Sequence, residues 1–244
     1  EEQFAVYKAA LEAMPGKAIT FRTMDIGGDK PVEALGLEQE QNAFLGYRAI
    51  RICLDRPELF LTQLRALLRA SAFGKVQIMF PMIATLEELR RAKKYVAQAK
   101  EQLAQKGQAF DPNAPVGMMV EVPAAAVLAR QFAREADFFS IGSNDLTQYT
   151  MAADRMNPKV EHLSNPMGPA VLTLIAQTIQ AAKRAGIPCS VCGELAGMVE
   201  AVPVLLGLGL EKFSVSPGKL LAVRRAIAGC SEEEAQRAAR RALS

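Results

Sequence analysis

The segment DFFSIGSNDLTQYTMAADR, Asp137 to Arg155, carries the most information about the fold of this chain. Its apolar run at 138–141 is too short for a helix and predicts a buried strand, which the polar sequence Gly142 to Asp145 then ends. Residues at the carboxyl end of a buried parallel strand lie where α/β proteins bind ligands. Asn144 and Asp145 are therefore the first candidates for a functional site.

Short β-type runs alternate with longer amphipathic segments along the rest of the chain, as in βα units repeated around a parallel sheet. The predicted strands are Ala18 to Arg22, Val76 to Phe80, Val116 to Glu121, Phe138 to Ile141, Ile187 to Val191 and Lys212 to Val215. Helices are predicted at the amino terminus, at Arg56 to Ala70, Thr85 to Lys106, Met167 to Ala185, Glu200 to Leu206 and Lys219 to Ala228, and from Ser231 onward. Thr85 followed by Glu88 predicts a capping box, and Ser231 predicts a helix cap.

This alternation predicts the α/β class and one large domain over residues 1–244. Six strands cannot close an eight-stranded barrel, so an open doubly wound sheet is an alternative. The chain has no initial methionine and opens on a predicted helix, from which we expect a fragment that lacks its first strands.

The composition excludes several classes of protein. With 50% hydrophobic and 23% charged residues, the 244-residue chain has an ordinary globular balance. The net charge of +3 is small and the basic residues are dispersed, which argues against nucleic acid as a partner. No apolar run reaches 18 residues and the first residues are acidic, so we expect neither membrane insertion nor a signal peptide, and a cytoplasmic location.

The chain contains four cysteines, too few for a disulfide framework of the secreted kind. Cys189 and Cys192 match C-x-x-C, which raises a redox or zinc site as an alternative. Positions three apart on a strand point to opposite faces, and a second pair of zinc ligands is missing, so we expect reduced thiols.

Polar residues follow almost every predicted strand, and parallel strands would bring them to one rim. Glu121 and Asp145 follow two consecutive predicted strands and are expected to bind Mg²⁺, which takes oxygen ligands and completes its shell with waters and phosphate. The alternative is that either carboxylate pairs with an arginine.

Three arginines are candidate anion clamps, because a guanidinium matches phosphate and carboxylate oxygens in pairs. They are Arg22, Arg48 and Arg155. Arg48 lies in FLGYRAIR, residues 44–51, which predicts a short helix. The segment Gly27 to Lys30 does not have nucleotide P-loop spacing, and its glycines are expected to bring Lys30 back over the site.

Cys192 lies at a predicted strand end before a glycine. A thiol of ordinary pKa is mostly protonated at neutral pH and can donate a proton, although a small buried hydrophobic role is equally consistent with the sequence. His162, the single histidine, is expected in a loop.

These residues together resemble the phosphoenolpyruvate-binding domain of the Enzyme I family of the bacterial sugar phosphotransferase system. The resemblance covers essentially the whole chain through RTMDIGGDKP, FLGYRAIRI, SAFGKVQIMFPMI, GMMVEVPAAA, FFSIGSNDLTQYTMAADR and CGELAG. Pyruvate phosphate dikinase and phosphoenolpyruvate synthase share versions of the N-D-L-T-Q and C-G-E motifs and are the alternative.

The resemblance implies a TIM (β/α)8-type barrel of the phosphoenolpyruvate-binding kind, here without its first two strands. It implies that phosphoenolpyruvate is bound with Mg²⁺ and that its phosphoryl group passes to a histidine on a separate amino-terminal domain, then to the carrier protein HPr, at the first step of sugar uptake. It also implies a homodimer. The implied roles are metal ligation by Glu121 and Asp145, substrate binding by Arg22, Lys30, Arg48, Asn144, Asp145 and Arg155, and protonation of the pyruvate enolate by Cys192.

The chain departs from the family pattern in two places. The phosphoryl-accepting histidine motif is absent and His162 does not match it, so this chain cannot complete the reaction alone. The R-T-E strand that supplies another phosphate-binding arginine is absent as well. A lyase that acts through a pyruvate enolate and a non-catalytic fragment of the family are the competing hypotheses.

Overall fold

A computed structural model describes residues 1–27, 36, 40 and 42–244 of the chain. It divides into two compact units, Glu1–Met118 (unit 1) and Met119–Ser244 (unit 2). Both units combine parallel strands with helices, which confirms the α/β class. Closure into a barrel and the absence of two strands stay predictions.

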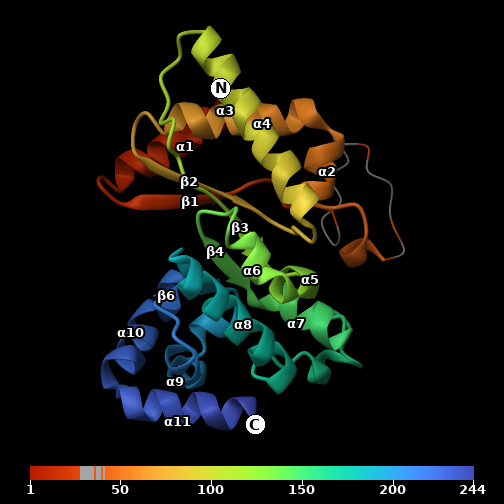
Figure 1. The fold of residues 1–244 in the computed structure, drawn as a ribbon, viewed down its shortest axis with the longest axis vertical. Coiled ribbons are helices and arrows are strands. Elements are labelled where there is room, and N and C mark those ends of the chain that lie inside the picture. Colours follow the sequence, from red (N-terminus) through yellow and green to blue (C-terminus); the bar gives the residue numbers. More distant parts are fainter. Residues whose placement is uncertain (28–35, 37–39, 41) are drawn as a thin grey trace. The chain divides into compact units, whose positions relative to one another are not determined.

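Unit 1 holds two parallel strands and the first residues of a third (Figure 1). Strand β1 (Ala18–Arg22) pairs with β2 (Lys75–Phe80), and β2 pairs with the first residues of β3 (Val116–Val120). The observed β1 has the predicted bounds, and the prediction for β2 is one residue short at its start.

The helices of unit 1 are α1 (Glu2–Ala13), α2 (Ile50–Asp55), α3 (Pro57–Ala70) and α4 (Leu86–Gln105), with a 3-10 turn η2 (Ala43–Leu45). The ring of Phe60 on α3 packs edge-on against Phe80 of β2 and Tyr95 of α4, which ties both helices to the sheet. The capping box predicted from Thr85 and Glu88 is present, with the Thr85 side chain accepting the Glu88 N–H.

Unit 2 holds β4 (Phe139–Gly142) and β6 (Lys212–Phe213), both labelled in Figure 1, and β5 (Cys189–Cys192). The strands pair in parallel, with Phe139 opposite Cys189 and Gly142 opposite Cys192. All four residues of β4 are buried, as expected for a parallel strand covered on both faces.

The helices of unit 2 follow the strands in βα order. They are α5 (Pro123–Val127), α6 (Ala129–Phe132), α7 (Ser143–Met151), α8 (Pro169–Ala185), α9 (Val202–Gly207), α10 (Leu220–Gly229) and α11 (Glu232–Leu243), with 3-10 turns η3 (Glu161–Leu163), η4 (Leu195–Gly197), η5 (Val199–Ala201) and η6 (Pro217–Lys219). Ser231 caps α11 in a second capping box, as predicted. Gly207 of α9 lies against the Ala235 carbonyl of α11, so these helices approach at backbone distance.

Two local predictions are wrong. Residues 44–51 do not form one helix: η2 ends at Leu45, and Ala49 takes a left-handed φ of 52° before α2 begins at Ile50. The single helix predicted over Glu200 to Leu206 is a 3-10 turn followed by α9, which starts where Pro203 occupies one of its first two positions.

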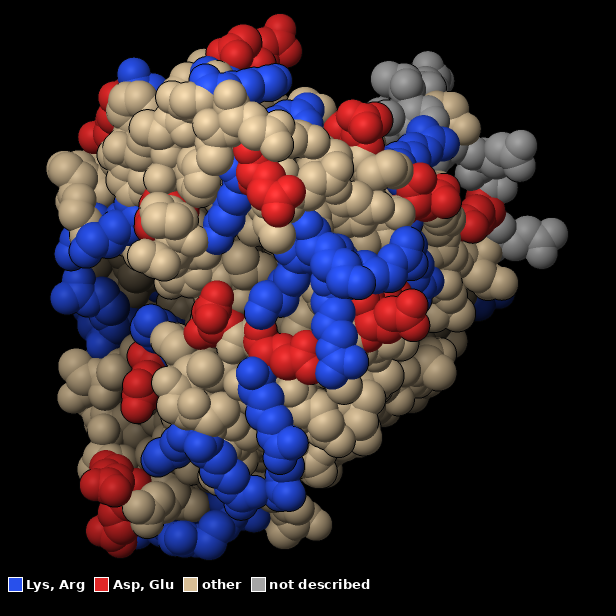
Figure 2. Space-filling view, turned by 45° about the horizontal axis from the view of Figure 1, so that its top comes forward, with Lys and Arg blue, Asp and Glu red and all other residues tan. Residues whose placement is uncertain are grey.

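The surface carries charges of both signs. Figure 2 shows Lys and Arg interspersed with Asp and Glu on the face in view, in keeping with the net charge of +3. Within the described part of the chain, no helix is long and apolar enough to cross a membrane. The four cysteines are free thiols.

Candidate functional site

In unit 2, the carboxyl ends of β4 and β5 form one local structure. Gly142 and Cys192, the last residues of the two strands, are register partners. Helix α7 begins immediately after Gly142, and the turn Cys192-Gly193-Glu194 follows β5. The first turn of α7 and this turn therefore meet at the sheet edge where α/β proteins place ligands.

Helix α7 starts at Ser143, where the sequence alone predicted only a polar strand end. Asp145 lies in its first turn, where the partial positive charge of the helix favours a carboxylate. Asp145 is only 7% exposed, and its Oδ1 accepts a hydrogen bond of 2.7 Å from Nη1 of Arg155. Asp145 and Arg155 thus form an ion pair within unit 2, and metal binding by Asp145 stays a prediction.

Arg155 is held from a second direction. Ala152 ends α7 in a left-handed conformation, which turns the chain back, and the Arg155 N–H donates to the Gln148 side chain at 3.1 Å. The Arg155 side chain is about a third exposed.

Glu121 follows β3 and is 2% exposed. A Cβ built on Gly142 would lie 2.8 Å from Glu121 Oε2 and 2.8 Å from its Cβ. The Glu121 side chain is thus placed beside the β4–α7 junction, and only a glycine at position 142 leaves the space next to its carboxylate.

Two hydrogen bonds join α7 to the turn after β5. Ser143 Oγ donates to the Cys192 carbonyl at 2.7 Å, and Asn144 Oδ1 accepts the Glu194 N–H at 3.0 Å. With its oxygen engaged, the Asn144 side chain presents its NH₂ group to any further acceptor. The Cys192 thiol lies 3.4 Å from the Ile141 carbonyl, to which it donates.

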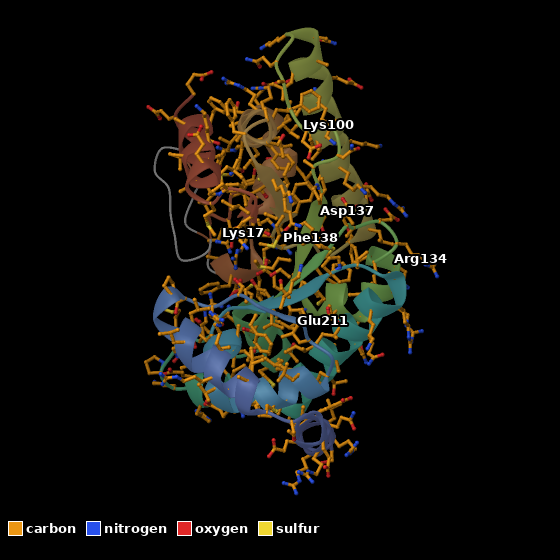
Figure 3. All side chains as sticks on the ribbon, turned by 90° about the vertical axis from the view of Figure 1, so that its left-hand side faces the viewer. Lys17, Lys100, Arg134, Asp137, Phe138 and Glu211 are labelled. Atoms are coloured by element: carbon orange, nitrogen blue, oxygen red, sulfur yellow. The ribbon has the colours of Figure 1, made fainter. Side chains whose placement is uncertain are left out.

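Carboxylates at the two ends of the unit 2 strands differ in burial. Figure 3 labels Asp137, which lies two residues before the start of β4, and Glu211, which directly precedes β6, and both are exposed. Glu121 and Asp145, at the carboxyl ends, are buried. Burying a carboxylate is unfavourable unless it gains partners, so the buried pair makes the carboxyl ends the candidate functional side.

Unit 1 contains a second cluster, formed by Arg22, Asp25 and Arg48. Each oxygen of the Asp25 carboxylate accepts from one guanidinium, Oδ2 from Arg22 at 2.9 Å and Oδ1 from Arg48 at 3.0 Å. Arg48 is 6% exposed, whereas the Arg22 side chain is 42% exposed. Asp25 therefore holds both predicted anion clamps in one group.

The backbone around Arg48 supports this arrangement. The Ala49 N–H donates to the Ile26 carbonyl at 3.0 Å, which ties the segment before α2 to the end of the β1 segment. Gly27 has a φ of +97°, and a Cβ there would lie 2.8 Å from Arg48 Cβ. A side chain at position 27 would displace Arg48.

The structure thus groups the predicted residues within each unit. Arg22 and Arg48 come together in unit 1, and Asn144, Asp145, Arg155 and Cys192 in unit 2, with Glu121 beside the start of α7. Lys30 lies outside the described residues. His162 is exposed in η3. Sequence reasoning assigned no role to Asp25 or Ser143; the Arg22/Asp25 spacing of three was visible, but the link to Arg48 was not.

A family model described as PEP-utilising enzyme, PEP-binding domain, matches residues 1–231 of the chain. The chain belongs to the PEP-utilising enzyme family. PEP is phosphoenolpyruvate, so this assignment agrees with the predicted resemblance.

Two curated relatives that carry the same name match nearly the whole chain. A phosphoenolpyruvate-protein phosphotransferase of Bacillus subtilis is 55% identical over 236 residues, covering 97% of this chain and 41% of the relative. One of Geobacillus stearothermophilus is 54% identical over 244 residues, covering 100% of this chain and 42% of the relative. The chain therefore spans about two fifths of the length of these relatives.

Two solved structures share the fold at low identity. A Haloferax volcanii malate synthase in complex with pyruvate and acetyl-CoA has a TM-score of 0.55 at 14% identity, over 92% of this chain and 55% of that chain. A citrate lyase from Burkholderia xenovorans LB400 has a TM-score of 0.53 at 18% identity, over 74% of this chain and 57% of that one. These likenesses concern the fold alone.

Proposed function

We propose that this PEP-utilising chain is the phosphoenolpyruvate-binding part of a phosphoenolpyruvate-protein phosphotransferase. It binds phosphoenolpyruvate with Mg²⁺, and the phosphoryl group passes to a histidine on a separate amino-terminal domain and then to the carrier protein HPr, releasing pyruvate. The observation that carries this proposal is the group at the carboxyl ends of β4 and β5, where a buried acid, an arginine, an amide and a thiol come together. The relatives named above support the same activity.

The substrate is an anion with a phosphate and a carboxylate, and the residues assigned to bind it are mainly cationic. We assign this role to Arg22, Lys30, Arg48 and Arg155, with Asn144 as a neutral donor. Asn144 suits the role because its oxygen is engaged by Glu194 N–H and its NH₂ group remains to donate. Positioned donors around a transferring phosphoryl group stabilise the charge that spreads over its oxygens.

The residues present fit a magnesium ion. Glu121 and Asp145 offer carboxylate oxygens, and Gly142 leaves the space beside Glu121 Oε2 that any side chain would fill. No group of three or more His, Cys, Asp or Glu residues suited to a metal occurs among the described residues. Two protein carboxylates agree with Mg²⁺, which keeps waters and takes substrate oxygens. When bound, the ion would neutralise charge on the phosphate and the enolate oxygen.

Cys192 is assigned the proton transfer. Phosphoryl transfer breaks the bond between phosphorus and the enol oxygen and forms a bond to the accepting histidine nitrogen, which leaves the enolate of pyruvate. The Cys192 S–H then gives its proton to the methylene carbon, and the thiolate is reprotonated by water. In the structure the Cys192 thiol lies 3.4 Å from the Ile141 carbonyl.

Titration calorimetry of the complete protein with phosphoenolpyruvate tests the proposal. We expect binding that requires Mg²⁺ and that Asp145→Ala weakens by about 100-fold or more, since a charged partner is removed. Glu211→Ala, which removes an exposed carboxylate at the amino end of β6, is the control and should bind as the wild type does. Binding that is unaffected by Asp145→Ala would refute the proposal.

The alternatives predict different products. Transfer of phosphate from labelled phosphoenolpyruvate to a histidine, and on to HPr, is expected here. A requirement for a nucleotide would favour a pyruvate phosphate dikinase or phosphoenolpyruvate synthase, and pyruvate release from a carbon–carbon cleavage substrate would favour a lyase.

A homodimer and a cytoplasmic location belong to the same proposal. Sedimentation tests the oligomeric state, and cell fractionation tests the location.

A further inference from the structure

We propose that Ser143 is a positioning residue for Cys192. The hydroxyl of Ser143 is 0% exposed and donates to the Cys192 carbonyl at 2.7 Å. This inference deepens the proposed function, since it concerns how the thiol assigned to proton transfer is held in place.

The contact is fixed on both sides. Gly142 and Cys192 are opposite each other in the β4/β5 register, so Ser143 is the first residue beyond the strand pair. Thr147, one helical turn later, donates to the Ser143 carbonyl at 2.7 Å and binds Ser143 into α7. The Ser143 hydroxyl thus links the rigid start of a helix to the residue that carries the thiol.

The turn after Cys192 is built around this link. Gly193 has a φ of +82°, and a Cβ there would lie 2.5 Å from Ser143 Oγ and 2.8 Å from Asn144 Oδ1. The hydrogen bond from Glu194 N–H to Asn144 Oδ1 closes the turn on its other side. The turn is therefore held at both ends by consecutive residues of α7, and it fits only with a glycine between them.

The position of the Cys192 backbone determines the direction of the Cys192 thiol. The Cys192 Sγ lies against the Ile141 carbonyl in β4, and its direction depends on where the Cys192 backbone sits. Loss of the Ser143 hydroxyl removes one hydrogen bond to the Cys192 carbonyl and lets the turn move away from α7. The same side chain then presents its S–H in a wider range of directions.

Alkylation of Cys192 by iodoacetamide tests this inference in the complete protein, without reference to any activity. Cys230→Ser removes another partly exposed thiol, and burial raises the pKa of Cys53 and Cys189 to about 12, so these two remain protonated and slow to react. In this background we expect Ser143→Ala to speed alkylation of Cys192 about fivefold, the factor that corresponds to one ordinary hydrogen bond.

Thr178→Val is the matched control. Thr178 is 0% exposed and its hydroxyl donates to the Leu174 carbonyl at 2.8 Å, within α8, so it is an equally buried hydroxyl with an equally short bond. We expect this variant to leave the alkylation rate unchanged. Gly193→Ala should act like Ser143→Ala, whereas Gly186→Ala, at a φ of +70° with nothing within 4 Å, should not.

A Ser143→Ala rate within about twofold of the parent protein overturns the inference, because a lost positioning bond must alter access to the thiol. Deuterium exchange into the methyl group of pyruvate, with Mg²⁺ present, measures the proton transfer itself. We expect Ser143→Ala to slow this exchange while the KM for pyruvate changes little. If the wild type shows no exchange, the proposed role of Cys192 fails, and the alkylation rates still decide whether Ser143 positions it.

Discussion

At the scale of single residues, the two clusters differ in how their charges are compensated. Asp25 serves two arginines with its two oxygens, whereas Asp145 accepts from Arg155 and also lies in the first turn of a helix. Both carboxyl groups are buried. Buried charge is stabilised here by partners within the same unit.

Asp145→Asn tests whether a buried ion pair contributes more to the free energy of unfolding than an exposed one. Glu233→Gln is the control, since Glu233 also lies in the first helical turn and pairs with an arginine, Arg237, at 2.8 Å, but both groups are exposed. We expect Asp145→Asn to lower the free energy of unfolding by about 1 to 3 kcal/mol, and Glu233→Gln by about 0.5 kcal/mol or less. Urea unfolding in the absence of metal measures both, and equal losses would contradict the prediction.

Gly27→Ala tests the close approach beneath Arg48. Gly27 and Gly16 both have positive φ, at +97° and +76°, but only Gly27 has neighbours that an added Cβ would meet. Gly16→Ala should cost about 1 kcal/mol for its backbone conformation alone, and Gly27→Ala about 1 to 3 kcal/mol more for displacing Arg48. Thermal or urea unfolding decides between this and an equal cost at the two glycines.

At the scale of elements, the close approach of α9 and α11 depends on one glycine. Gly207 and Gly229 are each the last residue of a helix, α9 and α10, yet a Cβ at 207 would overlap the Ala235 carbonyl and one at 229 would meet nothing within 4 Å. We expect Gly207→Ala to destabilise the protein by about 3 kcal/mol and Gly229→Ala to be neutral or slightly stabilising. Similar melting temperatures for the two variants would contradict this.

The same elements mark how far the sequence predicts the fold. The caps at Thr85 and Ser231 were predictable because their hydrogen bonds join residues three apart. The start of α7 was not, because Gly142 offers no capping side chain and the polar residues after it also suit a loop. The 3-10 turn before α9 was missed because the apolar residues of this segment predict one continuous helix. Pro203, near the start of α9, is the local residue that indicates the break.

For the candidate site, too, some features follow from the sequence and others do not. The sequence predicts which residue types follow each strand, and in the structure Asp145 and Arg155 form an ion pair. It could not predict Asp25 between Arg22 and Arg48, because that contact joins residues 23 apart through a backbone that leaves the helical region at Ala49. The contact of Ser143 with the Cys192 carbonyl depends on the β4/β5 register.

At the scale of the whole molecule, each unit has its own buried core and one thiol whose pKa is raised by its surroundings. Phe60 and Phe80 are among the fully buried side chains of unit 1, and Phe132 and Phe139 of unit 2. Burial raises the pKa of Cys53 in unit 1 from its ordinary value of 9.0 to about 12, and burial does the same for Cys189 in unit 2. Alkaline pH should therefore act on both units through the same chemistry.

Because the pKa values are raised in the folded chain, the free energy of unfolding should fall as the pH rises. Below pH 9 the thiols are protonated in both the folded and the unfolded chain, and the full stability is present; between pH 9 and about 12 only the unfolded chain loses the protons, so stability falls as pH rises. At about pH 10 each thiol should lower the free energy of unfolding by about 1 kcal/mol relative to about pH 7.5. Cys53→Ala and Cys189→Ala should each remove one such contribution, and Cys230→Ala is the control and should remove none.

Urea unfolding at the two pH values measures the differences. If the units unfold in separate steps, each variant should alter the pH dependence of its own step alone. A pH dependence that survives unchanged in both the Cys53 and the Cys189 variants would show that buried thiols do not set the alkaline stability of this protein.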